Sequence, residues 1–404
     1  MRITPNQITP TGPRLHALDN LRAVMMWLGV VLHVAAIYMV APSPLPWHDR
    51  QTSELADLLV VLIHSFRMPV FFILAGFFVT MLVQQRGTHG MLRNRLLRLG
   101  LPFGLLWPVI YLLCGVLALM FMHRMVRGTW GLDPGLIPPR EDAPKWNTLH
   151  MWFLWMLVWF SVFTAALIPL AQAVPLALRA RFSAAFEQLA SRAWGVAVLA
   201  LPLAVLGASY KEGMVVASGS FAPPLAEWLH NGLFYLFGLA LYGQRERLLA
   251  LYQRRWSAHA GAGLLCFVTA LTLVSLRREG GMALPHPTFW FALAYNACTW
   301  LWSFALIGLF LRYVNRPHPR LSYLAQSSYW VYLIHMPATI GFGALLYGPE
   351  WPALAKMALN IIATTAVSLL SYHFLVRSTP LGNLLNGRRY PRSPPAGVSQ
   401  AVSG

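Results

Sequence analysis

The chain has 404 residues, of which 57% are hydrophobic and only 11% are charged. These fractions exclude an ordinary soluble domain and are typical of a polytopic membrane protein. The net charge of +18 does not indicate nucleic-acid binding, because the basic residues are spread over short loops between apolar stretches. The three cysteines lie in apolar stretches without metal-ligand spacing, so no metal site is expected.

Apolar stretches long enough to cross about 30 Å of hydrocarbon recur along most of the chain. The sequence therefore predicts an all-α, polytopic membrane helix bundle of about ten transmembrane helices. We expect a polar N-terminal segment (1–13), a transmembrane domain (14–387) and a disordered tail (388–404). The predicted spans cover residues 20–40, 57–83, 97–122, 150–171, 194–209, 229–243, 260–276, 289–311, 323–346 and 353–376.

The distribution of Lys and Arg predicts the orientation of these spans. With the N-terminus in the cytoplasm, most of the 31 Lys and Arg residues fall on the cytoplasmic side. Both termini of this multi-pass chain are then expected to be cytoplasmic. Arg67 and Lys356 are counted on neither side, because both lie well inside predicted spans.

The first predicted span carries an arginine at its entrance and a histidine near its far end. Arg22 and His33 are separated by eleven residues, which places them within about 20° of one helix face and about 16 Å apart along the axis. An ionisable side chain inside the bilayer is costly and is a candidate for function. A buried histidine held by a structural hydrogen bond is the alternative for His33.

Four histidines and one arginine are predicted to reach a similar depth. Counting along the spans places His33, His64 and Arg67 in the outer half of the membrane, and His150 and His335 at a comparable level. A neutral histidine can take the proton of an attacking hydroxyl, as acyl transfer to an alcohol requires. The sequence contains no G-x-S-x-G, H-E-x-x-H or P-loop segment that would favour other chemistry.

A cluster of arginines lies at the predicted cytoplasmic end of the third span, where that span begins. It consists of Arg93, Arg95 and Arg98, and the last two share a helix face. Guanidinium groups match phosphate oxygens, so the cluster is a candidate site for a phosphorylated donor. Ordinary positive charge on the cytoplasmic side is the alternative.

Five segments, taken together, carry a family resemblance. They are Leu18–Arg22 with His33, His64–Phe78, Arg95–Arg98, Leu149–Leu154 and Tyr332–Pro337. In order and spacing they resemble the acyltransferase-3 family of integral membrane acyltransferases. The segment Leu149–Leu154 is similar to that of a branch acting on periplasmic glucan, although Met151 stands where leucine is usual.

The resemblance implies a membrane O-acyltransferase that moves a short acyl group from cytoplasmic acyl-CoA, either succinyl-CoA or acetyl-CoA. The acceptor would be a hydroxyl of an extracytoplasmic glycan, such as periplasmic glucan. No tightly bound cofactor and no nucleic-acid partner is expected, and the lipid bilayer is the surrounding partner. The implied roles are general base for His33, catalytic residues for Arg22 and Arg67, donor binding for Arg93, Arg95 and Arg98, and chamber lining for His64, His150, Tyr332 and His335.

Three alternatives stay open at this stage. A transporter could pass an anionic or sugar solute through the same polar chamber, although no half-chain symmetry is evident. Asp19 lies three residues before Arg22 and could neutralise it. Asp57 lies on the outer side of Arg67 and could be its structural partner.

Overall fold

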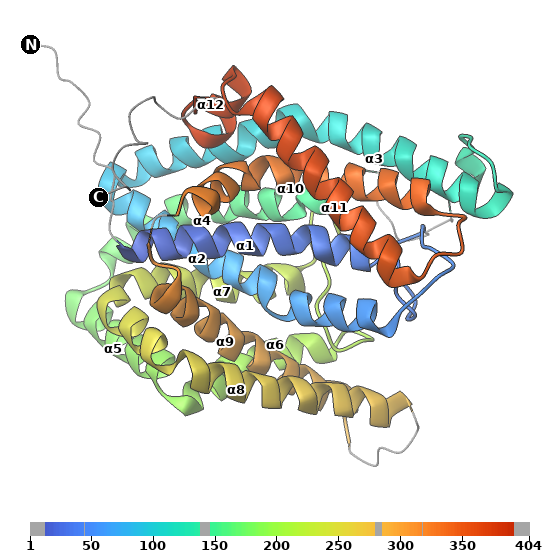
Figure 1. Cartoon of the computed structure of the whole chain (residues 1–404). Helices are drawn as coiled ribbons and strands as arrows, with labels where there is room; N and C mark the ends of the chain where they lie inside the picture. The colour runs from blue at the N-terminus through green and yellow to red at the C-terminus, as the bar shows by residue number, and fades with distance from the viewer. Residues whose placement is uncertain (1–12, 44, 138–145, 279–284, 317, 392–404) are drawn as a thin grey trace, which may run out of the picture. The chain divides into compact units, whose positions relative to one another are not determined.

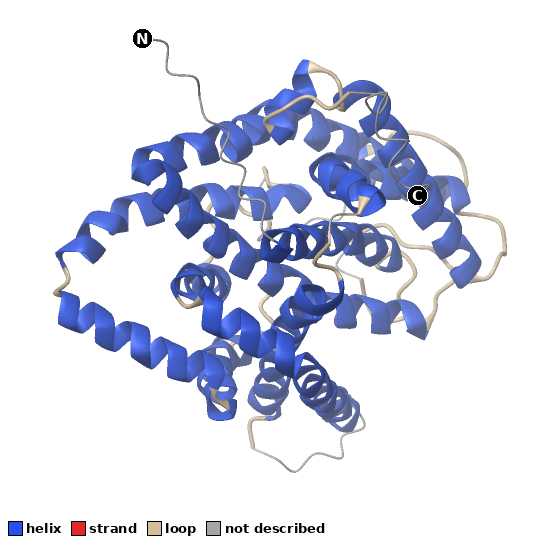
Figure 2. Cartoon of the chain, turned by 60° about the vertical axis from the view of Figure 1, so that its left-hand side comes forward, coloured by secondary structure: helices blue, strands red, loops and turns tan. Residues whose placement is uncertain are grey.

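The computed structural model describes residues 13–43, 45–137, 146–278, 285–316 and 318–391. Over these ranges the chain forms helices joined by loops and contains no strand (Figure 2). The prediction of an all-α polytopic membrane bundle is confirmed. Of the predicted terminal segments, residues 1–12 and 392–404 lie outside the described residues.

Twelve α-helices, labelled in Figure 1, follow one another in the described part of the chain. Every predicted span overlaps one of them. Two short π-helical turns, η1 (Leu96–Gly100) and η4 (Tyr372–Val376), and a 3₁₀ turn, η3 (Leu149–Met151), lie between them. The helices are α1 (Pro13–Ala35), α2 (Glu54–Arg95), α3 (Leu101–Arg127), α4 (Trp152–Ala173), α5 (Leu176–Ser191), α6 (Ala193–Ala208), α7 (Leu225–Gly243), α8 (Arg245–Arg278), α9 (Pro287–Tyr313), α10 (Pro319–Leu346), α11 (Ala353–Ser371) and α12 (Pro380–Asn386).

Seven helical segments of the described chain are long and apolar enough to cross a membrane, or eight if a bent pair counts as one span. One of the seven, Glu54–Arg127, contains two of the predicted spans. The bent pair is α5 and α6, which meet at 98°. The sequence did not predict α5 as a helix. The number of spans and the side on which the termini lie stay predictions.

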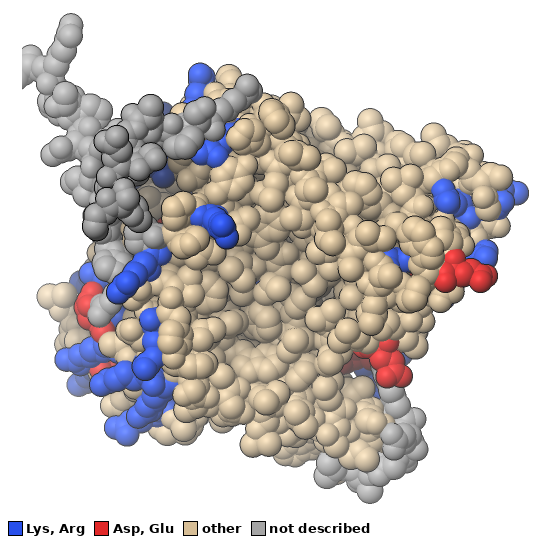
Figure 3. Space-filling model, in the orientation of Figure 1, with Lys and Arg blue, Asp and Glu red and all other residues tan. Residues whose placement is uncertain are grey.

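The chain divides into two compact units. In the first (1–24, 182–214 and 243–325), α8 and α9 lie side by side (Figure 1). Gly308 on α9 lies against the backbone of Tyr252, and the Trp302 indole donates a hydrogen bond to the Ala260 carbonyl at 3.2 Å. Basic side chains of this unit gather around α5 and the start of α8 (Figure 3).

The second unit (25–181, 215–242 and 326–404) contains a close seam between α2 and α7. A Cβ at Gly76 would collide with the backbone of Tyr235, and a Cβ at Gly238 would collide with that of Ile73. The Thr80 hydroxyl also donates to the Leu239 carbonyl across this seam, at 3.1 Å. Small residues let two membrane helices approach closely, so the glycines fix the register of α7 on α2.

The loop between α1 and α2 is tied to neighbouring helices by polar contacts. Lys356 on α11 donates to both carboxylate oxygens of Asp49, at 2.8 and 2.9 Å, and both side chains are 1% exposed. Arg50 donates to the Tyr347 hydroxyl at 2.8 Å. Asp57 accepts hydrogen bonds from the backbone N–H groups of residues 40 and 41. The loop is therefore held in one position directly after the helix that carries His33.

Candidate active site

Three imidazole rings contact one another in the second unit. The ring centroids of His33 and His335 are 5.1 Å apart, and those of His335 and His150 are also 5.1 Å apart. The phenol ring of Tyr332 lies 5.6 Å from the His150 ring and donates a hydrogen bond from its hydroxyl to the His150 carbonyl at 2.8 Å. The convergence expected from the sequence is thus seen for His33, His150, Tyr332 and His335.

The backbone of α10 determines which nitrogen of two imidazoles carries a proton. His335 Nδ1 lies 2.7 Å from the Tyr332 carbonyl, and His150 Nε2 lies 3.1 and 3.2 Å from the carbonyls of Tyr332 and Leu333. Carbonyls only accept, so these nitrogens carry the hydrogens. Pro337 has no N–H and therefore leaves the Leu333 carbonyl without its helical partner. The other nitrogen of each neutral ring, Nδ1 of His150 and Nε2 of His335, points away from these carbonyls. Neither has a hydrogen-bond partner among the described residues.

The position of His150 is set by an unusual turn before α4. Leu149 has φ 50°, a conformation that costs a bulky residue energy and that occurs often at functional sites. The turn is held by Asn147, whose side chain accepts from the Leu149 N–H at 2.9 Å, and by Thr148, whose hydroxyl donates to the Gly219 carbonyl at 2.8 Å. These bonds compensate for the strain and keep His150 against α10.

Arg67 is a buried cation in the same unit. Its side chain is packed to 9% exposure, and its Nε and Nη1 atoms have no hydrogen-bond partner. The remaining nitrogen makes only a 3.6 Å contact with the sulfur of Met68. A Cβ at Gly29 would lie 2.8 Å from Arg67 Nη1, and Gly29 is one helical turn before His33. The guanidinium is therefore on the His33 side of α1.

The acidic residues that could neutralise Arg67 are engaged elsewhere. Asp57, the alternative partner named from the sequence, binds the loop after α1. Asp49 pairs with Lys356, and Glu227 accepts from the Ser218 N–H at 2.9 Å. A buried charge without a counter-ion is costly, so Arg67 is a candidate for binding an anionic ligand.

His64 and a residue that the sequence analysis missed complete the arrangement. His64 lies three residues before Arg67 on α2 and is half-buried. His230 on α7 interacts electrostatically with His64, and its Nδ1 is buried without a partner. The predicted span began at residue 229, whereas α7 begins at Leu225, so His230 lies a turn deeper than the sequence suggested. The polar residues at 227, 230 and 231 were the signal that could have revealed it.

Arg22 lies in the first unit. Its guanidinium pairs with Asp19 at 3.1 Å, and both side chains are 44% exposed. Asn20 of the same motif donates to the Val314 carbonyl at 3.0 Å, at the end of α9. The motif thus contains structural contacts, and the catalytic role of Arg22 stays a prediction.

The three arginines expected to bind the donor differ in their surroundings. Arg93 is exposed, and Arg95 is half-buried near the Tyr235 hydroxyl. Arg98 donates to the carbonyls of Asn383 and Leu384 at 2.6 and 3.1 Å, and so caps the end of α12. Donor binding by these arginines stays a prediction, and for Arg98 it would require release of α12.

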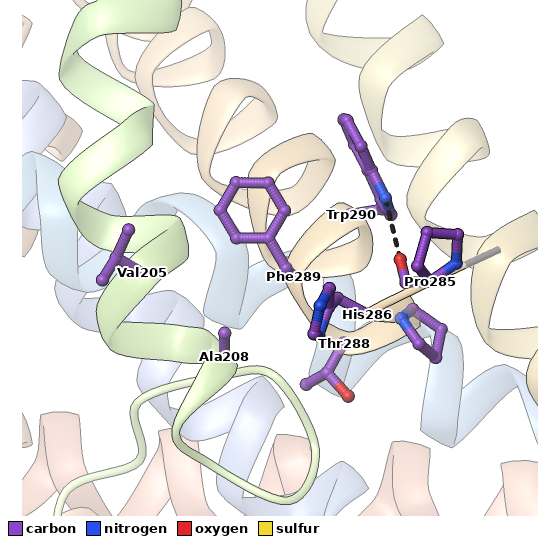
Figure 4. Close-up of a pocket in the computed structure, with 8 residues that line it drawn as sticks. Val205, Ala208, Pro285, His286, Thr288, Phe289 and Trp290 are labelled. Carbon is purple, nitrogen blue, oxygen red and sulfur yellow. Dashed lines mark hydrogen bonds between the residues drawn. The ribbon is translucent and has the colours of Figure 1, made fainter.

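A cavity of about 730 Å³ lies within the first unit (Figure 4). It is lined by α6, by the start of α9 and by the residues just before it. Among the described residues that line it, His286 is the only titratable one, and the Trp290 indole donates to the Pro285 carbonyl at 3.2 Å. The cavity therefore lacks the clustered polar chemistry of the histidine group.

Comparison with known proteins identifies the family. The model of an acyltransferase domain matches residues 15–373, which is most of the chain. The chain belongs to the acyltransferase-3 family. Members of the family similar to it include "Glucans biosynthesis protein C" of Shigella dysenteriae serotype 1 and of Escherichia coli K12. Each is 25% identical over 389 residues, covering 93% of this chain and 95% of the relative. No solved structure matches the chain.

Membership of the acyltransferase-3 family makes the chain a membrane acyltransferase. The transporter alternative has no comparable support. The family model covers the helices that carry all five histidines and Arg67, so the cluster lies within the conserved domain of that family model.

Proposed function

We propose that the protein transfers a short acyl group, succinyl or acetyl, from cytoplasmic acyl-CoA to a hydroxyl of an extracytoplasmic glycan. One observation carries this proposal: the His33 imidazole lies beside the Arg67 guanidinium, and within the described part of the chain the first has no hydrogen bond and the second no counter-ion. A base and an anion-stabilising cation are the two groups that thioester-to-alcohol transfer requires.

In the proposed reaction His33 removes the proton from the acceptor hydroxyl as its oxygen attacks the thioester carbonyl. The new C–O bond forms, the C–S bond breaks, and the proton passes to the leaving thiolate to give CoA–SH. The neutral imidazole of His335 contacts the His33 ring and keeps it oriented toward the chamber. No net proton is consumed, so the base is ready for the next cycle.

Arg67 would stabilise the negative charge that develops on the carbonyl oxygen. Its two unpartnered nitrogens suit this task, because they need no rearrangement when the charge appears. The same guanidinium could instead hold the distal carboxylate of a succinyl group. Comparing succinyl-CoA with acetyl-CoA separates these roles, since only the former has such a carboxylate.

The cytoplasmic donor would reach the chamber from the side of Arg93, Arg95 and Arg98. Arg93 is exposed, so its guanidinium can meet the CoA phosphates in the present arrangement of α12. The similarity to glucan biosynthesis proteins supports a glycan acceptor and a bacterial inner-membrane location. His64, His150, Tyr332 and His335 would line the chamber in which the acceptor binds.

The central test is transfer by membranes containing His33→Ala, supplied with labelled acyl-CoA and glucan oligosaccharides. We expect the rate to fall by about 10²–10⁴-fold, the usual contribution of a general base. His259→Ala is the matched control, because the Nδ1 of His259 is also buried without a hydrogen-bond partner among the described residues, but His259 belongs to the first unit. Full transfer by a normally expressed His33→Ala protein would refute the assignment.

A further inference from the structure

The seam between α2 and α7 has a consequence for the chamber. Both glycine contacts, Gly76 with α7 and Gly238 with α2, fix how far one helix is shifted along the other. His64 lies nine residues before Ile73, and His230 lies eight residues before Gly238, which packs on Ile73. At 1.5 Å per residue the two imidazoles differ in level by only about 1.5 Å if the helices run in parallel.

The two imidazoles are polar groups without partners. Neither His64 nor His230 forms a hydrogen bond with another residue of the described chain, and the buried Nδ1 of His230 has no acceptor or donor. Burial of an unsatisfied polar atom costs free energy, and a ligand that bonds to it recovers that cost. The neighbouring aromatic ring of Phe234, at 5.5 Å, supports the His230 ring without occupying its nitrogen.

We propose that His64 and His230 form a second hydroxyl-binding subsite, which holds a sugar hydroxyl next to the one that is acylated. This inference rests on the proposed function. A neutral imidazole presents one donor and one acceptor, so two of them can bind a hydroxyl from both sides. Arg67, three residues from His64, links this subsite to the reacting centre at His33. The acceptor would then be recognised as a polyol and not as a simple alcohol.

His230 is a positioning residue in this scheme, and its variants have a specific kinetic signature. With glucan oligosaccharide as acceptor, His230→Ala should raise KM about tenfold with kcat little changed, because ground-state and transition-state binding are lost equally. His230→Asn should recover much of the loss, since its amide lies close to the position of Nδ1. Acyl-CoA hydrolysis without acceptor should be unaffected, as should transfer to an alcohol with a single hydroxyl.

The experiment uses the full-length protein in lipid nanodiscs, with His259→Ala as the matched control. Binding of the oligosaccharide without donor, followed by tryptophan fluorescence, gives a readout independent of turnover. Unchanged KM and unchanged binding in both His64→Ala and His230→Ala, with active wild type, would overturn the subsite and leave the proposed function intact. A fall in kcat alone would also overturn it. Absence of transfer by the wild type would remove both proposals.

Discussion

Two cations are buried in the second unit, and they differ in what surrounds them. Lys356 donates to both oxygens of a carboxylate that is as buried as itself. Two nitrogens of Arg67 have no hydrogen-bond partner among the described residues. Both residues lie inside predicted spans, and only Arg67 was given a functional role from the sequence. In the structure Lys356 forms a buried ion pair, whereas Arg67 has no counter-ion among the described residues.

The difference shows how to distinguish a structural charge from a functional one in a membrane bundle. In a buried ion pair, the attraction between the two charges offsets the free energy lost when they are removed from water. An unpaired charge lacks this attraction, and a ligand can supply the missing interaction. Lys356 therefore fixes the loop after α1, whereas Arg67 is available for chemistry.

The largest expected effect is on stability, from Lys356→Met. This change leaves the carboxylate of Asp49 buried without a cation and should cost about 3–5 kcal/mol of unfolding free energy. Thermal unfolding of the purified protein in detergent measures the loss. Adding Asp49→Asn should restore much of it, because the unpaired charge is then absent. Equal stability of Lys356→Met and wild type would contradict the buried-pair interpretation.

Arg67→Met should produce the opposite pattern. Removing a charge without a counter-ion offsets the lost packing, so the variant should be no less stable than the wild type. Transfer should nevertheless fall by about 10²–10³-fold, as expected when a transition-state donor is removed.

Arg67→Lys is the matched variant, since it keeps the charge and loses the planar fork. It should retain more activity than Arg67→Met. Side-by-side transfer assays and unfolding curves of the two variants test the comparison. A destabilised Arg67→Met protein with normal turnover per folded molecule would show that Arg67 is structural.

The smallest expected effect concerns Arg22, an exposed cation that is paired. Loss of such a pair costs about 0–1 kcal/mol, so Arg22→Gln should unfold almost as the wild type does. Asp19→Asn removes the same pair and keeps the cation. A requirement for the guanidinium itself would appear as lower transfer in Arg22→Gln but not in Asp19→Asn.

Much of the chamber could be predicted by counting residues along apolar spans. His33, His150 and His335 converge as expected, because helices that cross the same membrane place residues at calculable depths. Pro337 explains why the rings lie as they do, but only once the Leu333 carbonyl is seen beside His150. The sequence predicted that these histidines lie at similar depth, and it gave no information on their tautomers.

What the sequence did not reveal is contact between residues distant in the chain. His230 was missed because its position beside α2 depends on the glycine seam between the two helices and not on the apolar pattern of α7. Donor binding by Arg98 stays a prediction, but the hydrogen bonds of its guanidinium to carbonyls 285 and 286 residues later in the chain were not foreseen. Such pairings leave no local signature.

The order of the chamber residues along the chain has a consequence for biogenesis. His33, His64, Arg67 and His150 leave the ribosome early, but His335 is supplied only by α10. Until that helix inserts, the nascent protein holds polar groups in the bilayer that lack their final neighbours. Under the proposed mechanism, transfer therefore starts only after α10 has inserted, so unfinished chains would not acylate the acceptor.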